Sequence, residues 1–232
     1  MQLSLSIGLR DDASFDNFYP GENSVAVQHL QHLHDAEKAD GSVYLWGAVA
    51  SGKTHLLQAL CHQATEKTLS SAYLPLSQWQ ELDVQMLEGL ENYDLICVDD
   101  VDVVAGQMDW EQALFHLYNQ LRDKEGQVVV AASTSLQDSP LQLPDLKSRL
   151  GWGVVFHLKE LSEPEKISAL QNRARRRGFE MPDNVAQYLI RHFSRDMNSL
   201  LDMLNALDKA SLIAQRKLTI PFVKQWLEGE EK

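Results

Sequence analysis

The sequence predicts an α/β fold, with a five-stranded parallel sheet flanked by helices and a small all-α domain after it. Short apolar runs alternate with amphipathic stretches from about residue 25 to residue 160, which is typical of βαβ units. After residue 161 only helical periodicity continues. The charge balance changes at the same place: residues 1–160 contain 9 Lys and Arg against 23 Asp and Glu, whereas residues 161–232 contain 12 against 10. These observations indicate two domains.

We therefore predict an extended tail over residues 1–11, an α/β domain over residues 12–160 and a helical lid domain over residues 161–232. Strands are predicted at residues 43–46, 71–76, 95–99, 128–133 and 154–158. Helices of the first domain are predicted at residues 24–36, 54–66, 77–90 and 109–122. Helices of the second are predicted at residues 163–177, 182–193, 197–214 and 221–227, with Gly178 after the first and Pro221 in the first turn of the last.

The composition is that of an ordinary globular protein, with 44% hydrophobic and 23% charged residues. A net charge of −12 argues against a protein that coats DNA by its bulk charge. No apolar run is long enough to cross a bilayer, and the N-terminus lacks the basic and apolar regions of a secretory signal, so we expect a cytosolic protein. Cys61 and Cys97 have no CxxC spacing and are expected to be small buried hydrophobes.

A phosphate-binding loop is predicted at residues 47–54, GAVASGKT, which fit G-x-x-x-x-G-K-[ST] between a predicted strand and a predicted helix. The glycines let backbone N–H groups turn toward phosphate oxygens, and the helix N-terminus adds a favourable dipole. Lys53 would reach the β- and γ-phosphates, and the Thr54 hydroxyl would bind Mg²⁺. An accidental glycine-rich turn is the alternative. The nucleotide contacts predicted here are Gly47, Val49, Ala50, Ser51, Gly52, Lys53, Thr54 and His55.

Acidic and polar side chains follow two further predicted strands. Asp99 and Asp100 end the run LICVDD, and the carboxyl edge of a parallel sheet is where such folds bind ligands. Asp99 would support Mg²⁺, and Asp100 would orient or deprotonate an attacking water, or would instead only cap the next turn. Ser133 ends the following strand, where it would contact the γ-phosphate or be an ordinary loop hydroxyl.

Two basic features are each open to two interpretations, and a group of histidines has one. Arg149 precedes the last strand and could act across a subunit boundary on a neighbour's nucleotide, although spacing alone would equally allow a surface arginine. The basic run at residues 173–177 could bind nucleic acid, but a solvated helix end is favoured. His29, His32 and His34 show no metal-ligand spacing and are expected at the surface.

Several segments resemble a known family, the DnaA branch of the AAA+ proteins. They are SFDNFYPGEN at residues 14–23, GKTHLL at 52–57, VDDVDVVAG at 98–106 and LKSRLGWG at 146–153. Within that branch the chain is most similar to the Hda family. The supporting features are QLSLSI at residues 2–7, the stretches ALQNRARRRGFEMP and ASLIAQRKLTIPFVK, and an end shortly after LTIPFVKQWL without a helix-turn-helix domain. The resemblance covers residues 2–228.

The resemblance implies roles for particular residues. Arg149 matches the arginine finger offered to the ATP of DnaA, and the strip at residues 15–21 matches the one that packs on the adenine side. The AAA+ lid usually has an arginine at the position of Asn198, and Arg195, three residues away, could replace it if that turn is helical. The implied adenine-side contacts are Phe18, Tyr19 and Pro20, and the implied contacts to the sliding clamp are Gln2, Leu3, Leu5 and Ile7.

The resemblance also implies an activity. Hda proteins bind ADP, dock on the DNA-loaded sliding clamp (the β subunit of DNA polymerase III) and stimulate ATP hydrolysis by DnaA, which prevents re-initiation. We therefore expect ADP or ATP with Mg²⁺, DnaA and the clamp as partners, no membrane and no sequence-specific DNA binding. A homo-oligomer through the Arg149 face stays open. An autonomous ATPase such as a DnaC-like helicase loader is the alternative, because Lys53, Asp99 and Asp100 are what an active ATPase needs.

Overall fold

The computed structural model describes residues 9, 13–35, 42–193 and 196–230. Contacts divide the chain into two compact units, Met1–Glu160 and Leu161–Lys232. Each unit has its own buried core, so each is described by itself. No helix within the described ranges is both long enough and apolar enough to span a bilayer.

The first unit is built on a five-stranded sheet in the order β2-β3-β4-β1-β5, and every pair of neighbours is parallel, as the sequence predicts. The strands are β1 (Ser42–Trp46), β2 (Ser71–Pro75), β3 (Leu95–Asp99), β4 (Gln127–Ala132) and β5 (Val154–His157). Trp46, the last residue of β1, lies beside Ala132 of β4 and His157 of β5. The carboxyl ends of these strands therefore lie at one edge of the sheet.

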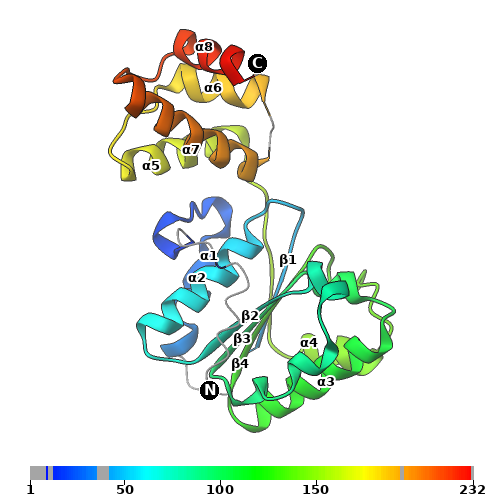
Figure 1. Cartoon of the computed structure of the whole chain (residues 1–232). Helices are drawn as coiled ribbons and strands as arrows, with labels where there is room; N and C mark the ends of the chain where they lie inside the picture. The colour runs from blue at the N-terminus through cyan, green and yellow to red at the C-terminus, as the bar shows by residue number, and fades with distance from the viewer. Residues whose placement is uncertain (1–8, 10–12, 36–41, 194–195, 231–232) are drawn as a thin grey trace. The chain divides into compact units, whose positions relative to one another are not determined.

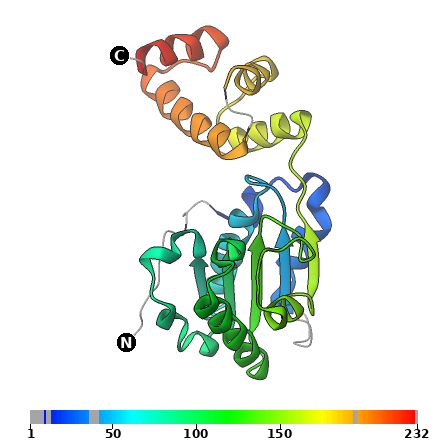
Figure 2. The same ribbon diagram turned by 90° about the vertical axis from the view of Figure 1, so that its right-hand side faces the viewer.

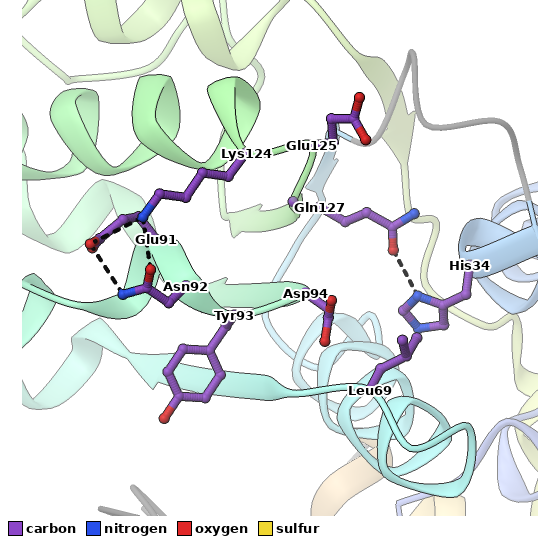
Figure 3. A pocket seen from close by; sticks show the side chains of 10 residues that line it. His34, Leu69, Glu91, Asn92, Tyr93, Asp94, Lys124, Glu125 and Gln127 are labelled. Carbon is purple, nitrogen blue, oxygen red and sulfur yellow. Dashed lines mark hydrogen bonds and ion pairs between the residues drawn. The ribbon is translucent and has the colours of Figure 1, made fainter.

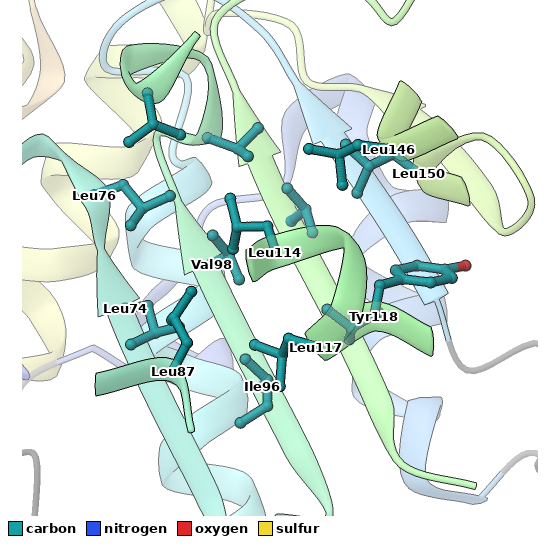
Figure 4. Close-up of a cluster of buried hydrophobic side chains, with 14 of the residues drawn as sticks. Leu74, Leu76, Leu87, Ile96, Val98, Leu114, Leu117, Tyr118, Leu146 and Leu150 are labelled. Atoms are coloured by element: carbon teal, nitrogen blue, oxygen red, sulfur yellow. The ribbon is translucent and has the colours of Figure 1, made fainter. Parts of the chain in front are cut away.

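Helices cover both faces of the sheet (Figures 1 and 2). One face carries α1 (Ser24–Gln31) and α2 (Lys53–Glu66), and the other carries α3 (Met108–Asp123) and α4 (Pro144–Leu150). Side chains alternate between the faces along each strand, so Leu45 packs with the α2 side and Tyr44 with the α3 side. Figure 4 shows the buried side chains on the second of these faces, where α3 and α4 lie against β2, β3 and β4.

The helix predicted at residues 77–90 is wrong. The segment forms three 3₁₀ turns, η5 (Leu76–Glu81), η6 (Val84–Leu87) and η7 (Leu90–Asn92). The Asp83 carboxylate accepts a hydrogen bond from the backbone N–H of Gln85 at 2.9 Å, which caps a new turn and competes with a continuous helix. Gly89, at φ 87°, adopts a left-handed conformation between η6 and η7 and starts the last turn. The apolar periodicity was therefore produced by separate turns that each bury one side chain.

Other predicted boundaries differ by a few residues. The helix predicted at 24–36 ends at Gln31 and is followed by the 3₁₀ turn η3 (Leu33–Asp35). The helix α4 was not predicted, although Pro144 at its first turn and Gly151 after its last residue are typical of helix ends. The remaining 3₁₀ turns are η1 (Phe15–Asn17), η2 (Gly21–Asn23) and η8 (Val101–Val104). Cys61 and Cys97 are free and buried, as predicted.

The second unit is wholly helical within the described residues. Its helices are α5 (Glu163–Arg176), α6 (Asp183–His192), α7 (Met197–Ala214) and α8 (Ile220–Glu230). Ser162 and Glu165 form a capping box at the start of α5, and the Asp196 carboxylate caps α7 by accepting from Ser199 N–H. The interpretation of the basic run as a solvated helix end is wrong for Arg173, whose side chain is buried, whereas the following arginines are exposed.

Candidate functional site

Three predicted site segments meet at the carboxyl edge of the sheet. The loop at residues 47–54 follows β1, the Asp99-Asp100 pair ends β3, and Ser133 follows β4. Because β3, β4 and β1 are consecutive neighbours in a parallel sheet, their ends lie side by side. The topology thus brings together the residues that the sequence motifs single out separately.

The loop at residues 47–54 turns tightly before α2. Ala50 has φ 65° and Gly52 has φ 98°, and alternating backbone conformations of this kind point successive N–H groups into one concavity. A Cβ at Gly47 would collide with the carbonyl oxygen of Leu158, and one at Gly52 would come within 2.5 Å of the Phe18 ring. Val49 is 80% exposed at the tip of the loop. Both glycines are therefore required by their surroundings as well as by the motif.

Lys53 is the first residue of α2, and its side chain reaches back to the start of this loop. Its side chain is buried, and its ammonium group donates to the carbonyl oxygens of Gly47 at 2.7 Å and Ala48 at 2.9 Å. Burial lowers the pKa of Lys53, and the carboxylates of Asp100 and Asp99 oppose that shift. The lysine is thus fixed inside the concavity of the loop, with acidic groups close by.

Asp99 lies at the end of β3 and is only 2% exposed, and its two carboxylate oxygens differ in their hydrogen-bond partners. Oδ2 accepts a hydrogen bond of 2.8 Å from the hydroxyl of Tyr73 on β2, whereas Oδ1 is buried without a hydrogen-bond partner. Burial and the Asp99 charge raise the pKa of Tyr73, so its hydroxyl stays protonated and available as a donor. The phenol therefore fixes the rotation of the carboxylate and leaves one oxygen for another ligand.

Asp100 and Asp102 extend the acidic edge. Asp100 has φ 57° and ψ 47°, a left-handed conformation that starts η8, and burial together with the Asp99 charge raises its pKa. The backbone N–H of Ser133 donates to Asp102 Oδ2 at 3.2 Å, which ties the end of β4 to the turn after β3. The Ser133 side chain is exposed, so its hydroxyl is accessible beside this turn.

The segment at residues 14–20 packs beside the loop. The Phe18 ring lies over Gly52 and against the His55 ring, with 5.5 Å between the ring centroids. A His55 ring nitrogen pairs with the carbonyl oxygen of Ser14 at 2.9 Å. Farther on, Asn23 exchanges two hydrogen bonds with the backbone of Lys159, of 2.9 and 2.8 Å. These contacts hold the segment, including Tyr19 and Pro20, along the first turn of α2.

The arrangement fits a phosphate group with a divalent cation. The loop offers a concave backbone and a buried ammonium group to an anion. Ser51 Oγ and Asp99 Oδ1 are buried polar atoms without protein partners, which is costly unless a ligand satisfies them. Mg²⁺ prefers oxygen ligands such as carboxylates and hydroxyls, and Thr54, exposed in the first turn of α2, could supply a hydroxyl.

Arg149 lies at the opposite edge of the sheet. It belongs to α4, which ends just before β5 begins, and Val154 of β5 pairs with Val43 at the start of β1. The loop at residues 47–54 follows the other end of β1. Within one chain, Arg149 and the phosphate-binding loop are therefore separated by the length of these strands, and Arg149 is not placed to contact a phosphate bound in its own loop.

A buried carboxylate fixes the start of α4. Glu111 of α3 is 0% exposed and accepts hydrogen bonds from the backbone N–H groups of Gly106 at 2.7 Å, Gln142 at 2.9 Å and Leu143 at 2.6 Å. Leu146 and Leu150 then place one side of the helix in the core shown in Figure 4. The backbone that carries Arg149 is thus held at both ends.

Some predicted site residues fall outside this geometry. Gln2, Leu3, Leu5, Ile7 and Arg195 lie outside the described residues, so the structure does not test their roles. Asn198 is the second residue of α7, and its side chain is exposed.

A separate pocket of about 250 Å³ lies at the amino ends of β3 and β4 (Figure 3). Lys124 pairs there with Glu91, and a His34 ring nitrogen bonds to Gln127 Oε1 at 2.7 Å. The prediction of a surface histidine is wrong for His34, because this residue of η3 is half-buried against Gln127 of β4, and this burial lowers its pKa. His29 is also partly buried and packs on Phe156, whereas His32 is exposed.

The sequence motifs did not single out four residues that position groups at the carboxyl or the amino edge of the sheet. Tyr73 and Glu111 had no signal, because a tyrosine in a strand and a glutamate in a helix are ordinary. Asp102 stands in the acidic run VDDVD, whose spacing could have indicated it. Trp152 lies three residues after Arg149, a separation that places two side chains on the same side of a helical turn.

Comparisons with known proteins agree with this geometry. The family described as the bacterial DnaA ATPase domain matches residues 9–157, and the family described as the Hda lid domain matches residues 163–227. Domain III of the Thermotoga maritima replication initiation protein DnaA has a TM-score of 0.79 at 24% identity and covers 96% of this chain and 98% of its own.

Two further structures show the same fold. AMPPCP-bound DnaA from Aquifex aeolicus has a TM-score of 0.72 at 22% identity, over 85% of this chain and 66% of its own. The Thermotoga maritima RuvB Holliday junction branch migration motor has a TM-score of 0.61 at 17% identity, over 89% of this chain and 67% of its own. At these identities the structural likeness shows the fold alone. The two family matches go further: the chain joins a DnaA-type ATPase domain to an Hda lid, and it belongs to the Hda family of DnaA-related AAA+ proteins.

Proposed function

We propose that this protein is a nucleotide-bound regulatory adaptor that stimulates ATP hydrolysis by the replication initiator DnaA through Arg149, and so prevents re-initiation. Membership of the Hda family implies a role in the regulation of DnaA. Beyond this family role, we propose that the protein regulates DnaA by stimulating its ATP hydrolysis and that Arg149 is the residue responsible. Because its partners act on the bacterial chromosome, we place this activity in the cytosol.

The position of Arg149 is the observation that carries the proposal. Arg149 lies at the amino edge of β5, whereas the phosphate-binding loop lies at the carboxyl edge of β1. A guanidinium there can reach a nucleotide only if the nucleotide belongs to a second subunit. When such an arginine is delivered in trans, it neutralises charge that develops on the transferred phosphoryl group, and this accelerates hydrolysis by about 10³–10⁵-fold in well-studied GTPases.

The protein's own loop at residues 47–54 would hold a nucleotide that is part of the active adaptor and that the protein itself hydrolyses only slowly. Gly47–Gly52 backbone groups and Lys53 would bind the phosphates, Thr54 and Asp99 would hold Mg²⁺, and Phe18 would border the base side. Asp100 and Ser133 would lie near the γ-phosphate position. We infer ADP as the bound form, because Asn198 replaces the arginine that the resemblance places in the lid.

The second proposed contact is with the sliding clamp. The segment Gln2 to Ile7 offers one amide and spaced apolar side chains, which suit a pocketed groove on a partner. Docking on the DNA-loaded clamp would raise the effective concentration of Arg149 near DNA-bound DnaA. The stimulation would then depend on the clamp being on DNA.

An autonomous ATPase is the alternative, because Asp99, Asp100 and Lys53 are all in place around the loop. The test is single-turnover hydrolysis of ATP pre-bound to DnaA, with DNA-loaded clamp and with or without this protein. We expect hydrolysis to accelerate only when protein and clamp are both present. Absence of acceleration, together with steady ATP turnover by the isolated protein, would establish the autonomous enzyme instead.

A further inference from the structure

Arg149 does not stand free at the sheet edge, because it stacks on an aromatic side chain of its own chain. Its guanidinium carbon lies 3.8 Å from the centre of the Trp152 ring and 5.9 Å from that of Phe115. The guanidinium carbon of Arg122, from α3, lies 4.5 Å from the same indole. Trp152 is 50% exposed, which is unusual for so large an apolar side chain.

The backbone fixes the indole relative to the arginine. Trp152 N–H donates to the carbonyl oxygen of Arg149 at 3.1 Å, so the two residues are joined in one turn at the end of α4. A Cβ at the next residue, Gly153, would collide with the carbonyl oxygen of Ser42, so the chain is pressed against β1 immediately after the indole. The backbone at Trp152 is therefore fixed by contacts that do not involve the Arg149 side chain.

Stacking leaves the hydrogen-bonding capacity of the guanidinium unused. Within the described part of the chain, neither Arg149 nor Arg122 has an ion pair or a hydrogen bond from its guanidinium. A cation–π contact uses the face of the guanidinium, whereas the N–H donors point outward in its plane. The plane is thus fixed while the donors that would bind a phosphate remain available.

We propose that Trp152 is the positioning residue of the arginine finger: its indole fixes the plane of Arg149 before a partner's nucleotide is engaged. The inference rests on the proposed function, since it concerns how Arg149 acts in trans. Arginine loses side-chain entropy when it is immobilised, and a pre-formed stack removes part of that loss from the step in which the phosphate is bound. Arg122 holds a second positive charge beside the same ring, and it adds to the attraction for an anion.

The first test observes the stack directly in the whole protein. Ring current from the indole should shift the ¹⁵N-edited Nε–H proton signal of Arg149 away from those of exposed arginines, and the variant Arg149→Ala assigns that signal. We expect Trp152→Ala and Trp152→Leu to move the signal to the exposed position and Trp152→Phe to move it only partly. A wild-type Arg149 signal at the exposed position would overturn the proposal.

The second test separates positioning from simple contact. In the single-turnover assay with DnaA, Trp152→Ala should lower the maximal stimulated rate roughly 2- to 30-fold, as expected from loss of one cation–π contact, without changing the half-saturating concentration. Trp152→Phe should recover part of the rate and Trp152→Leu should not. Val155→Ala, which trims another exposed apolar side chain close by, is the matched control and should keep the wild-type rate.

The outcomes are distinguishable from failure of the proposed function. If Arg149→Ala stimulates as well as wild type, the arginine-finger function itself is wrong. If Arg149→Ala is inactive while Trp152→Ala retains the full maximal rate, only the positioning role is wrong. A Trp152→Ala variant that raises the half-saturating concentration at an unchanged maximal rate also contradicts positioning, because it would make the indole an ordinary interface contact. Trp152→Phe keeps the test usable if the alanine variant does not fold.

Discussion

Replacing Glu111 by Gln should destabilise the first unit, although the two side chains have nearly the same shape. One oxygen of the buried carboxylate accepts a hydrogen bond from the backbone N–H of Gly106, and the other accepts one from that of Leu143. The backbone N–H of Gln142 donates to both oxygens. Glutamine has one carbonyl oxygen, so its NH₂ group must face a backbone donor on one side. One charge-assisted hydrogen bond is then lost and one buried N–H is left without an acceptor.

The magnitude follows from these contacts. A hydrogen bond to a charged group contributes about 1.5–3 kcal/mol, and a buried unpaired donor costs about 1–3 kcal/mol. The two costs overlap because both concern the same backbone N–H, so we expect a loss of about 2–4 kcal/mol in the free energy of unfolding. For a domain of this size that corresponds to a fall in Tm of roughly 4–16 °C. Calorimetry measures the fall, and amide hydrogen exchange at Gln142 and Leu143 should quicken because the loop that starts α4 opens locally.

The matched control is Glu66→Gln, the same chemical change at an exposed position at the end of α2. It should change stability by less than about 0.5 kcal/mol. If Glu111→Gln melts at the same temperature as Glu66→Gln, the argument that the carboxylate organises this loop is refuted.

Four further outcomes follow from the described contacts and the predicted roles. Lys53→Ala should weaken ADP binding and reduce the rise in Tm that ADP produces, which calorimetry would show; equal affinity would refute the phosphate role. Tyr73→Phe should keep the fold but raise the Mg²⁺ concentration needed for tight nucleotide binding, because Asp99 loses the hydroxyl that fixes its rotation; an unchanged Mg²⁺ titration would contradict that role. Gln2→Ala combined with Leu3→Ala should abolish clamp binding in a surface-binding assay without changing Tm. Burial lowers the pKa of His34, so as the pH falls the unfolded chain binds a proton at this residue before the folded chain does. The free energy of unfolding should therefore be highest above the pH range in which an ordinary histidine protonates, and it should decline below that range. His34→Gln should flatten this decline in a pH series of denaturant titrations.

The strands and the phosphate-binding loop were predictable because their signals are local. Each strand is a short run of apolar or β-branched residues, and residues 47–54 combine a fixed spacing with a strand before and a helix after. The meeting of Asp99 and Ser133 with that loop also follows from the sequence, because parallel strands share one carboxyl edge. The roles predicted for Arg149 and for residues 2–7 came from a family resemblance, because no local pattern indicates them.

The wrong prediction at residues 77–90 and the contacts that were not predicted have physical causes. The helix predicted at residues 77–90 matched a helical period by chance, because each 3₁₀ turn buries its own apolar residue, and Asp83 and Gly89 each start a new turn. The hydrogen bond from Tyr73 to Asp99 and those that Glu111 accepts depend on side chains meeting across elements. Such pairs leave no mark in the spacing of one segment.

Single-turnover hydrolysis with Arg149→Ala is the most direct test of the proposed mechanism. The variant should keep its fold, its bound nucleotide and its clamp interaction, because Arg149 lies at the edge of the sheet away from its own phosphate-binding loop. It should nevertheless fail to stimulate hydrolysis of ATP on DnaA in the presence of DNA-loaded clamp, and Arg149→Lys should fail as well, because an ammonium group does not reproduce the planar fork. Stimulation by Arg149→Ala equal to that of the wild type would contradict the central claim.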